Sequence, residues 1–264
     1  MKKYIFLLLL SSLVVGQSEA ASTPMVWWVD HKNGDDSNSG ATEATAVKTV
    51  YKAMKNIGWF NGDTIKVKPA LNSDGSLSYY DFGNSEIDLN TSKDFVLIGT
   101  AGADSTIFDA EEKNRHFNIR YTTSNTIIKG ITFKNGTTSN WPGGGSIFLE
   151  YSNTALQFVD CKWENNFVVS NEGGGAIIIR DGATPSFTNC VFKNNYVVGT
   201  DNSNQGGAVN IQWPGNKADL ENTIYFKNTK FINNYLKMKY EARGGAVASE
   251  RNVEFENCLF VNNR

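Results

Sequence analysis

Short apolar segments recur along the second half of the chain at intervals of about 30 residues. Each segment has a Cys, Ile or Thr position, an aromatic residue two places later and polar residues after that. Five copies occupy residues 131–136, 161–166, 190–195, 229–234 and 258–263. A unit of this length cannot bury its apolar side alone, so successive units must stack on one another. The pattern predicts an elongated repeat protein.

A second motif alternates with the first and consists of two glycines, Ser or Ala, and then Ile or Val. Its copies lie at 144–147, 174–177, 206–209 and 244–247, and each leads into a short apolar run that is typical of a strand. Each unit also contains a second short strand, which ends at an apolar residue. Two residues after that end, the successive units have Gly130, Asp160, Asn189, Asn228 and Asn257. These residue types tolerate a positive φ, so each unit is expected to turn there.

Three short strands per unit, with turns at fixed points, predict an all-β parallel β-helix. Like residues would then stack in columns, spaced as neighbouring strands are. The expected inward columns are the Cys/Ile/Thr positions and two sets of mainly aromatic positions: Phe133, Trp163, Phe192, Phe231 and Phe260, and Ile128, Phe158, Phe187, Phe226 and Phe255. The column Asn165, Asn194, Asn233 and Asn262 is expected to form an amide ladder. A helical solenoid is the main alternative, which the β-branched, aromatic, Gly and Asn content disfavours.

The N-terminal part has a different pattern, and we expect residues 21–60 to cap the solenoid of residues 61–264. Residues 26–29 predict a strand and residues 30–40 a polar loop. Apolar positions at Val47, Val50, Tyr51, Met54 and Ile57 predict an amphipathic helix that Gly58 ends. Such a helix would cover the open edge of the first coil.

The two ends of the chain carry further expectations. Residues 1–20 have the pattern of a secretory signal: Lys2 and Lys3, an apolar run over 4–15, and Ser18-Glu19-Ala20 as a cleavage site. This predicts export, to the medium or to the cell surface or outer membrane. The apolar run is shorter than the roughly 20 residues that span a bilayer, so a membrane-spanning protein is not expected. At the other end Arg264 follows a complete strand, which predicts a truncated chain or, if the chain ends there, end-to-end self-association.

Composition narrows the choice of partners and cofactors. The net charge is −2 and no basic patch stands out, so nucleic acid is not an expected partner. Three cysteines do not make a disulfide framework, and their shared slot favours packing, with a Cys161–Cys190 disulfide as the alternative. With two histidines, a zinc site is not expected, and no cofactor is required.

Two family resemblances follow from these motifs. The Gly-Gly-Ala-Ile/Val copies and the Phe-x-Asn-Asn copies at 192–195, 231–234 and 260–263 resemble the repeats of the chlamydial polymorphic outer-membrane proteins. The N-terminal segments Val29-Asp30, 33–40, 48–50 and 62–65 resemble the opening of secreted proteins with the pectin-lyase-like fold. The resemblance implies a right-handed, single-stranded parallel β-helix. It leaves the activity open, since adhesins, autotransporter passengers, lyases and hydrolases share this fold.

Three sets of residues are candidates for a site. Stacking would bring Glu150 close to Arg180 and Asp181, a combination that suits acid–base catalysis, although solvated charges at strand ends would give the same pattern.

Asp30, Asp35 and Asp36 offer oxygen ligands for calcium, the one candidate cofactor, or they stabilise a polar turn. Trp141 and Trp213 each precede Pro-Gly and could stack on sugar rings or cover a coil corner. The two tryptophans lie on opposite sides of the strand that follows the glycines, so they need not form one binding surface.

The function expected from the sequence is that of an exported or cell-surface module, resembling an adhesin or autotransporter passenger. It would bind polysaccharide or a host or cell-surface protein without catalysis of its own. The alternative is a carbohydrate-active enzyme, either a polysaccharide lyase or a glycoside hydrolase. A structural spacer is the third option.

Overall fold

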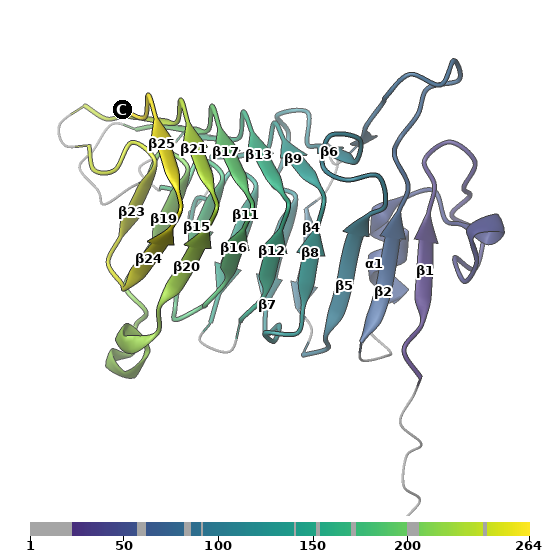
Figure 1. Cartoon of the computed structure of the whole chain (residues 1–264), viewed down its shortest axis with the longest axis horizontal. Coiled ribbons are helices and arrows are strands. Elements are labelled where there is room, and N and C mark those ends of the chain that lie inside the picture. The colour runs from purple at the N-terminus through teal and green to yellow at the C-terminus, as the bar shows by residue number, and fades with distance from the viewer. Residues whose placement is uncertain are drawn as a thin grey trace, which may run out of the picture.

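The computed structural model of this chain is an all-β parallel solenoid of about six turns (Figure 1). It describes residues 23–56, 62–81, 86–90, 92–139, 141–151, 154–169, 173–199, 206–239 and 242–264. The predicted signal sequence at 1–20, and Ile57 and Gly58 of the predicted helix, lie outside the described residues. The coils follow one another along the long axis, from β1 (Val26–Val29) at one end to β25 (Leu259–Val261) at the other.

Four parallel sheets run along the solenoid, numbered here by the order in which one coil passes through them. Sheet 1 contains β4 (Ile87–Asn90), β7 (Phe117–Arg120), β11 (Ile147–Glu150), β15 (Ile177–Ile179), β19 (Val209–Ile211) and β23 (Val247–Ser249). Sheet 2 contains β1, β2 (Asp63–Val67), β5 (Phe95–Gly99), β8 (Ile127–Lys129), β12 (Gln157–Val159), β16 (Ser186–Thr188), β20 (Ile224–Lys227) and β24 (Val253–Glu256).

Sheet 3 contains β3 (Tyr80–Asp81), β6 (Ile107–Asp109), β9 (Thr132–Lys134), β13 (Lys162–Glu164), β17 (Val191–Lys193), β21 (Lys230–Ile232) and β25. Sheet 4 contains β10 (Thr137–Thr138), β14 (Phe167–Val169), β18 (Tyr196–Val198) and β22 (Tyr235–Lys237). The sequence predicted three strands per coil, and sheet 4 is the strand position it missed. Its strands come directly after the paired Asn-Asn or Asn-Gly residues and are two or three residues long.

The predicted inward columns form the core. Phe133, Trp163, Phe192 and Phe231 are fully buried, and successive rings stack with centroids 4.6–5.4 Å apart. The second set, from Ile128 to Phe226, is also fully buried and meets the first edge to face, as between Phe158 and Trp163 (5.1 Å, 79°). In the last described coil Phe255 and Phe260 are 42% and 47% exposed.

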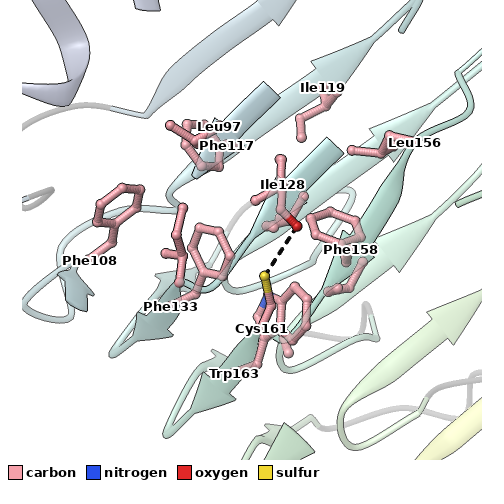
Figure 2. Packing of buried hydrophobic residues seen from close by; sticks show 14 of the residues in the cluster. Leu97, Phe108, Phe117, Ile119, Ile128, Phe133, Leu156, Phe158, Cys161 and Trp163 are labelled. Atoms are coloured by element: carbon pink, nitrogen blue, oxygen red, sulfur yellow. Dashed lines mark hydrogen bonds between the residues drawn. The ribbon is translucent and has the colours of Figure 1, made fainter. Parts of the chain in front are cut away.

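The Cys column packs as a hydrophobic column, as predicted. Ile131, Cys161, Cys190 and Thr229 are fully buried, and the three cysteines are free thiols. Figure 2 shows Cys161 between the aromatic columns, where its thiol donates to the carbonyl oxygen of Ile128 (3.4 Å). Burial raises the pKa of Cys161 to about 12, so it stays an uncharged, unreactive packing group.

The turn positions are also confirmed. Positive φ values occur at Gly130 (66°), Asp160 (53°), Asn189 (55°), Asn228 (51°) and Asn257 (52°). A second turn follows sheet 3, where Asn165, Asn194, Asn233 and Asn262 have φ between 52° and 57°. The coils therefore turn sharply at these two points on residues that adopt this conformation at low cost.

The buried amide ladder is shifted by one residue from its predicted column. It is made by the second asparagine of each pair: Asn166, Asn195, Asn234 and Asn263. Each amide nitrogen donates to the next amide oxygen at 2.9–3.0 Å and to a backbone carbonyl of the preceding coil. Of the predicted column, Asn194 donates to Asn165 (3.2 Å) on the exposed side. The prediction holds for this exposed pair, and the buried ladder lies one residue later because the first asparagine takes the positive φ and turns its side chain outward.

The paired glycines stand where two backbones meet. A Cβ on Gly175 would lie 2.3 Å from the carbonyl oxygen of Gly207 and 2.5 Å from that of Tyr196. A Cβ on Gly174 would lie 2.2 Å from the carbonyl oxygen of Ile177. Both glycines of the motif are thus required, since the segment passes flat against sheet 4 and the next coil.

The N-terminal segment packs on the first coils through α1 (Val50–Asn56), preceded by the short 3-10 helix η1 (Glu43–Thr45). Val50, Ala53 and Met54 are buried in the main core. The helix begins later than predicted, because Val47 forms a parallel bridge with Val29 instead of a helical turn. Tyr51, expected on the apolar face, is 46% exposed. None of the helices in the described part of the chain has the length and apolar content needed to span a bilayer.

Candidate functional site

The outward side of sheet 1 carries the charged residues that the sequence singled out. Along β11, Ile147 and Leu149 point into the core, so Glu150 at the strand end belongs to the outward row. Glu150 pairs in register with Arg120 of β7. On the next coil, the backbone N–H of Arg180 donates to the carbonyl oxygen of Leu149 (2.9 Å), which places Arg180 beside Glu150. The predicted neighbours are therefore brought together.

Glu150 and Asp181 form a hydrogen-bonded pair of carboxyl groups. Partial burial raises the pKa of Glu150, and the hydrogen bond and charge repulsion from Asp181 raise it further. Arg180 and Arg120 oppose the shift and do not cancel it. Two carboxyl groups this close hold a proton more tightly than either would alone. The arrangement can supply both a proton donor and acceptor oxygens to a bound hydroxyl-rich molecule.

Trp141 lies over Arg180. The Arg180 Cζ atom is 4.3 Å from the centre of the Trp141 ring, a cation–π contact. The indole is 66% exposed even so. The Nη1 atom of Arg180 is buried and has no hydrogen-bond partner among the described residues.

Trp213 reaches the same region from the following coil. Its backbone N–H donates to Glu250 Oε2 (2.8 Å), and its side chain is 47% exposed. Gly215 lies beside Asp181, since a Cβ at Gly215 would stand 3.7 Å from Asp181 Oδ1. Both Trp-Pro-Gly segments thus border the Arg180–Asp181 dipeptide, although the sequence pattern did not require a shared location.

Two tyrosines at this site were missed at the sequence level. Tyr121 and Tyr151 stack with ring centres 5.0 Å apart and planes at 13°, and Tyr151 is hydrogen-bonded to Glu150. Tyr121, Tyr151 and Asp181 share one slot of the repeat, and all three have positive φ. The 30-residue spacing was the signal that could have found them. We refer to Trp141, Glu150, Arg180, Asp181 and Trp213 as the sheet 1 patch.

Two of the three N-terminal aspartates bind groups of their own segment. Asp36 Oδ1 accepts from the backbone N–H groups of Lys48 and Thr49 at 2.9 Å, just ahead of α1. Asp35 accepts from the N–H and hydroxyl of Ser37.

Asp30 accepts from the backbone of Lys32 and Asn33 and pairs with Lys68 (2.8 Å), which also pairs with Glu43 (3.0 Å). The Lys68 ammonium therefore occupies the point between carboxylates where a cation would be held. Across the described ranges, no group of three or more His, Cys, Asp or Glu side chains is placed to bind a metal.

No protein-family model matches this chain, and the comparison with curated proteins found no match. The function is therefore argued from the residues of the sheet 1 patch.

Proposed function

We propose that this chain is an exported β-helix module that binds polysaccharide through the sheet 1 patch, without catalysis of its own. The observation that carries the proposal is the Trp141 indole, which is largely exposed yet held against the Arg180 guanidinium at 4.3 Å. A pyranose ring presents a flat C–H face that packs on an indole, and its hydroxyls need nearby donors and acceptors. Arg180, Glu150 and Asp181 supply both.

The same reading assigns roles to the rest of the chain. A right-handed winding, with repeats like those of the chlamydial polymorphic outer-membrane proteins, fits the glycine and asparagine motifs. We assign residues 1–20 to export and α1 to covering the first coil. An adhesin-like protein at the cell surface would use the long solenoid to present the patch, with polysaccharide as its ligand in place of a host protein.

The proposal is tested by replacing the indole. Trp141→Ala is expected to weaken binding to a responsive polysaccharide about tenfold, since the stacking contact is worth roughly 1.4 kcal/mol. Affinity electrophoresis against a panel of neutral and acidic polysaccharides measures the effect. Tyr225→Ala removes an exposed aromatic on sheet 2 and serves as the matched control. Equal retardation of the wild type and Trp141→Ala on every gel would rule the patch out.

An enzyme is the second candidate, because the raised pKa of Glu150 is what a general acid needs. Against it, the carboxyls of glycosidases stand roughly 5 Å or more apart, whereas Glu150 and Asp181 are hydrogen-bonded to each other. Release of reducing or unsaturated ends that is lost in Glu150→Gln would make the chain a glycoside hydrolase or lyase, and loss on chelation would add calcium. If the chain neither cleaves nor binds any polysaccharide, the structural spacer is the remaining function.

A further inference from the structure

Three aromatic rings form a stack on sheet 4, away from the core. Phe167, Tyr196 and Tyr235 are paired in register, half-buried, and nearly parallel. Their centroids are 5.0 Å and 4.8 Å apart, with interplanar angles of 5° and 1°. The rings inside such a stack cover one another's faces, so only an end ring can offer a face to a ligand. In the preceding coil the register partner of Phe167 is Thr137, a small side chain.

A cavity of about 440 Å³ lies at this end of the stack. Its volume is within the roughly 300–1,000 Å³ of small-molecule sites. Phe167 and Val169 of β14 line the cavity together with Thr137, Thr138 and Ser139. The remaining wall comes from Glu86, which directly precedes β4, and from the segment before β7, with Glu112, Lys113, Asn114 and Arg115.

The polar wall is held in place by its own contacts. Arg115 Nε donates to Glu86 Oε2 (2.6 Å), and its Nη1 donates to the carbonyl oxygen of Gly143 (2.7 Å). Lys113 is paired with Glu111 (2.5 Å). Burial raises the pKa of Tyr196, and the neighbouring Tyr235 and the charge of Glu112 raise it further. The lining residues carry two positive and two negative side chains, which gives the cavity no net charge.

An aromatic face, polar lining side chains and no net charge together describe a site for an uncharged, hydroxyl-rich ring. We propose that this cavity is a subsite for a neutral pyranose unit, whose C–H face lies on Phe167 and whose hydroxyls meet the Glu112, Asn114 and Thr138 side. A charged sugar is disfavoured because its charge would lie beside lining side chains of the same sign. The cavity shares no residue with the sheet 1 patch, so the inference stands independently of the proposed function.

The test uses the full chain and a panel of neutral gluco-, manno-, xylo- and galacto-oligosaccharides. Saturation-transfer NMR identifies a binder, and calorimetry measures its Kd. Phe167→Leu is expected to raise that Kd about tenfold, and Phe167→Tyr, which keeps a ring face, is expected to restore binding. Tyr225→Leu, on sheet 2, should leave the Kd unchanged. Circular dichroism of each variant establishes that the fold is kept.

Two results would overturn the inference: no neutral oligosaccharide binds, or Phe167→Leu binds as tightly as the wild type. If Trp141→Ala abolishes binding while Phe167→Leu does not, the sheet 1 patch is right and the cavity subsite is wrong. If Phe167→Leu abolishes binding while Trp141→Ala does not, the cavity subsite is right and the patch is wrong. Loss in both variants supports two subsites for one glycan.

Discussion

At the scale of single residues, Asn195 shows how a polar side chain is accommodated in this core. Its amide oxygen accepts from the backbone N–H and the side chain of Asn166, at 3.0 Å and 2.9 Å. Its amide nitrogen donates to the carbonyl oxygen of Trp163 and to Asn234 Oδ1, both at 3.0 Å. Every donor and acceptor of this buried amide is satisfied, so the ladder links coils without a cost for burying polar atoms.

Removing one member of the ladder should destabilise the folded state. Asn195→Ala leaves buried partners unpaired above and below, and we expect the free energy of unfolding to fall by about 3 kcal/mol. Urea denaturation measures the loss. Asn194→Gly is the control: it keeps the positive φ and deletes only the exposed bond to Asn165, so a loss under about 1 kcal/mol is expected. Similar losses in the two variants would contradict a structural role for the buried ladder.

The Glu150–Asp181 pair has a pH signature. The pKa of Glu150 is raised from its ordinary value of 4.5. The folded state therefore keeps this proton at a pH where the unfolded chain has lost it, and the contribution to stability, full below 4.5, is lost as pH rises through the folded pKa. Asp181→Asn, which tolerates the positive φ there, is expected to lower the pKa of Glu150 and flatten this slope.

Carbon-13 NMR titration of the glutamate carboxyls gives the pKa directly, and melting temperatures between about pH 3 and 8 give the slope. Glu254→Gln, an exposed carboxylate on sheet 2, is the control and should change neither quantity for Glu150. A Glu150 pKa that stays the same in Asp181→Asn would mean that burial alone raises it.

At the scale of elements, the paired glycines let the coil close. The segment that carries them lies between sheet 4 and the next coil, and its backbone touches both. A strand can pass this close to two others only if it has no side chain there. The motif is therefore a packing requirement, repeated once in each coil.

A single methyl group should break this contact. Gly175→Ala would place its Cβ within 2.6 Å of backbone atoms of Gly207 and Tyr196, which cannot move without displacing sheet 4. We expect a loss of about 3 kcal/mol or more in the free energy of unfolding. Gly75→Ala, where nothing lies within 4 Å, costs only its backbone strain, about 1 kcal/mol. Thermal unfolding of both variants decides the matter, and matching melting temperatures would refute the steric argument.

The sequence allowed the strands of sheets 1, 2 and 3 to be predicted, because each holds a recurring apolar residue. Sheet 4 escaped because Thr137, Phe167, Tyr196 and Tyr235 differ in polarity and their inner neighbours form a small separate cluster of Val168, Val197 and Leu236. The helix was predicted to begin too early, since Val47 forms a strand bridge that no 3.6-residue period reveals.

At the scale of the whole molecule, the repeat predicted the stacking of coils and the charge neighbours of sheet 1. It could not predict that Trp141 and Trp213 would border the same dipeptide, nor the cavity beside Phe167. Those features depend on segments that occur once and carry no period. The residue type at a repeat position thus indicates where that residue lies in the solenoid. The chemistry of the surface comes from the segments that do not repeat.

One coil of the repeat is longer than its neighbours, with 39 residues from Cys190 to Thr229 where the next coil uses 29. The pairing of sheet 3 passes through it unchanged, with Phe192 on Phe231. Part of the extra length is the short 3-10 helix η2 (Lys217–Glu221), which lies outside all four sheets. Length can therefore be gained there in evolution at little thermodynamic cost, while deleting one strand residue would turn a whole face inside out. The η2 region is therefore a suitable place to insert foreign peptides into this rigid scaffold.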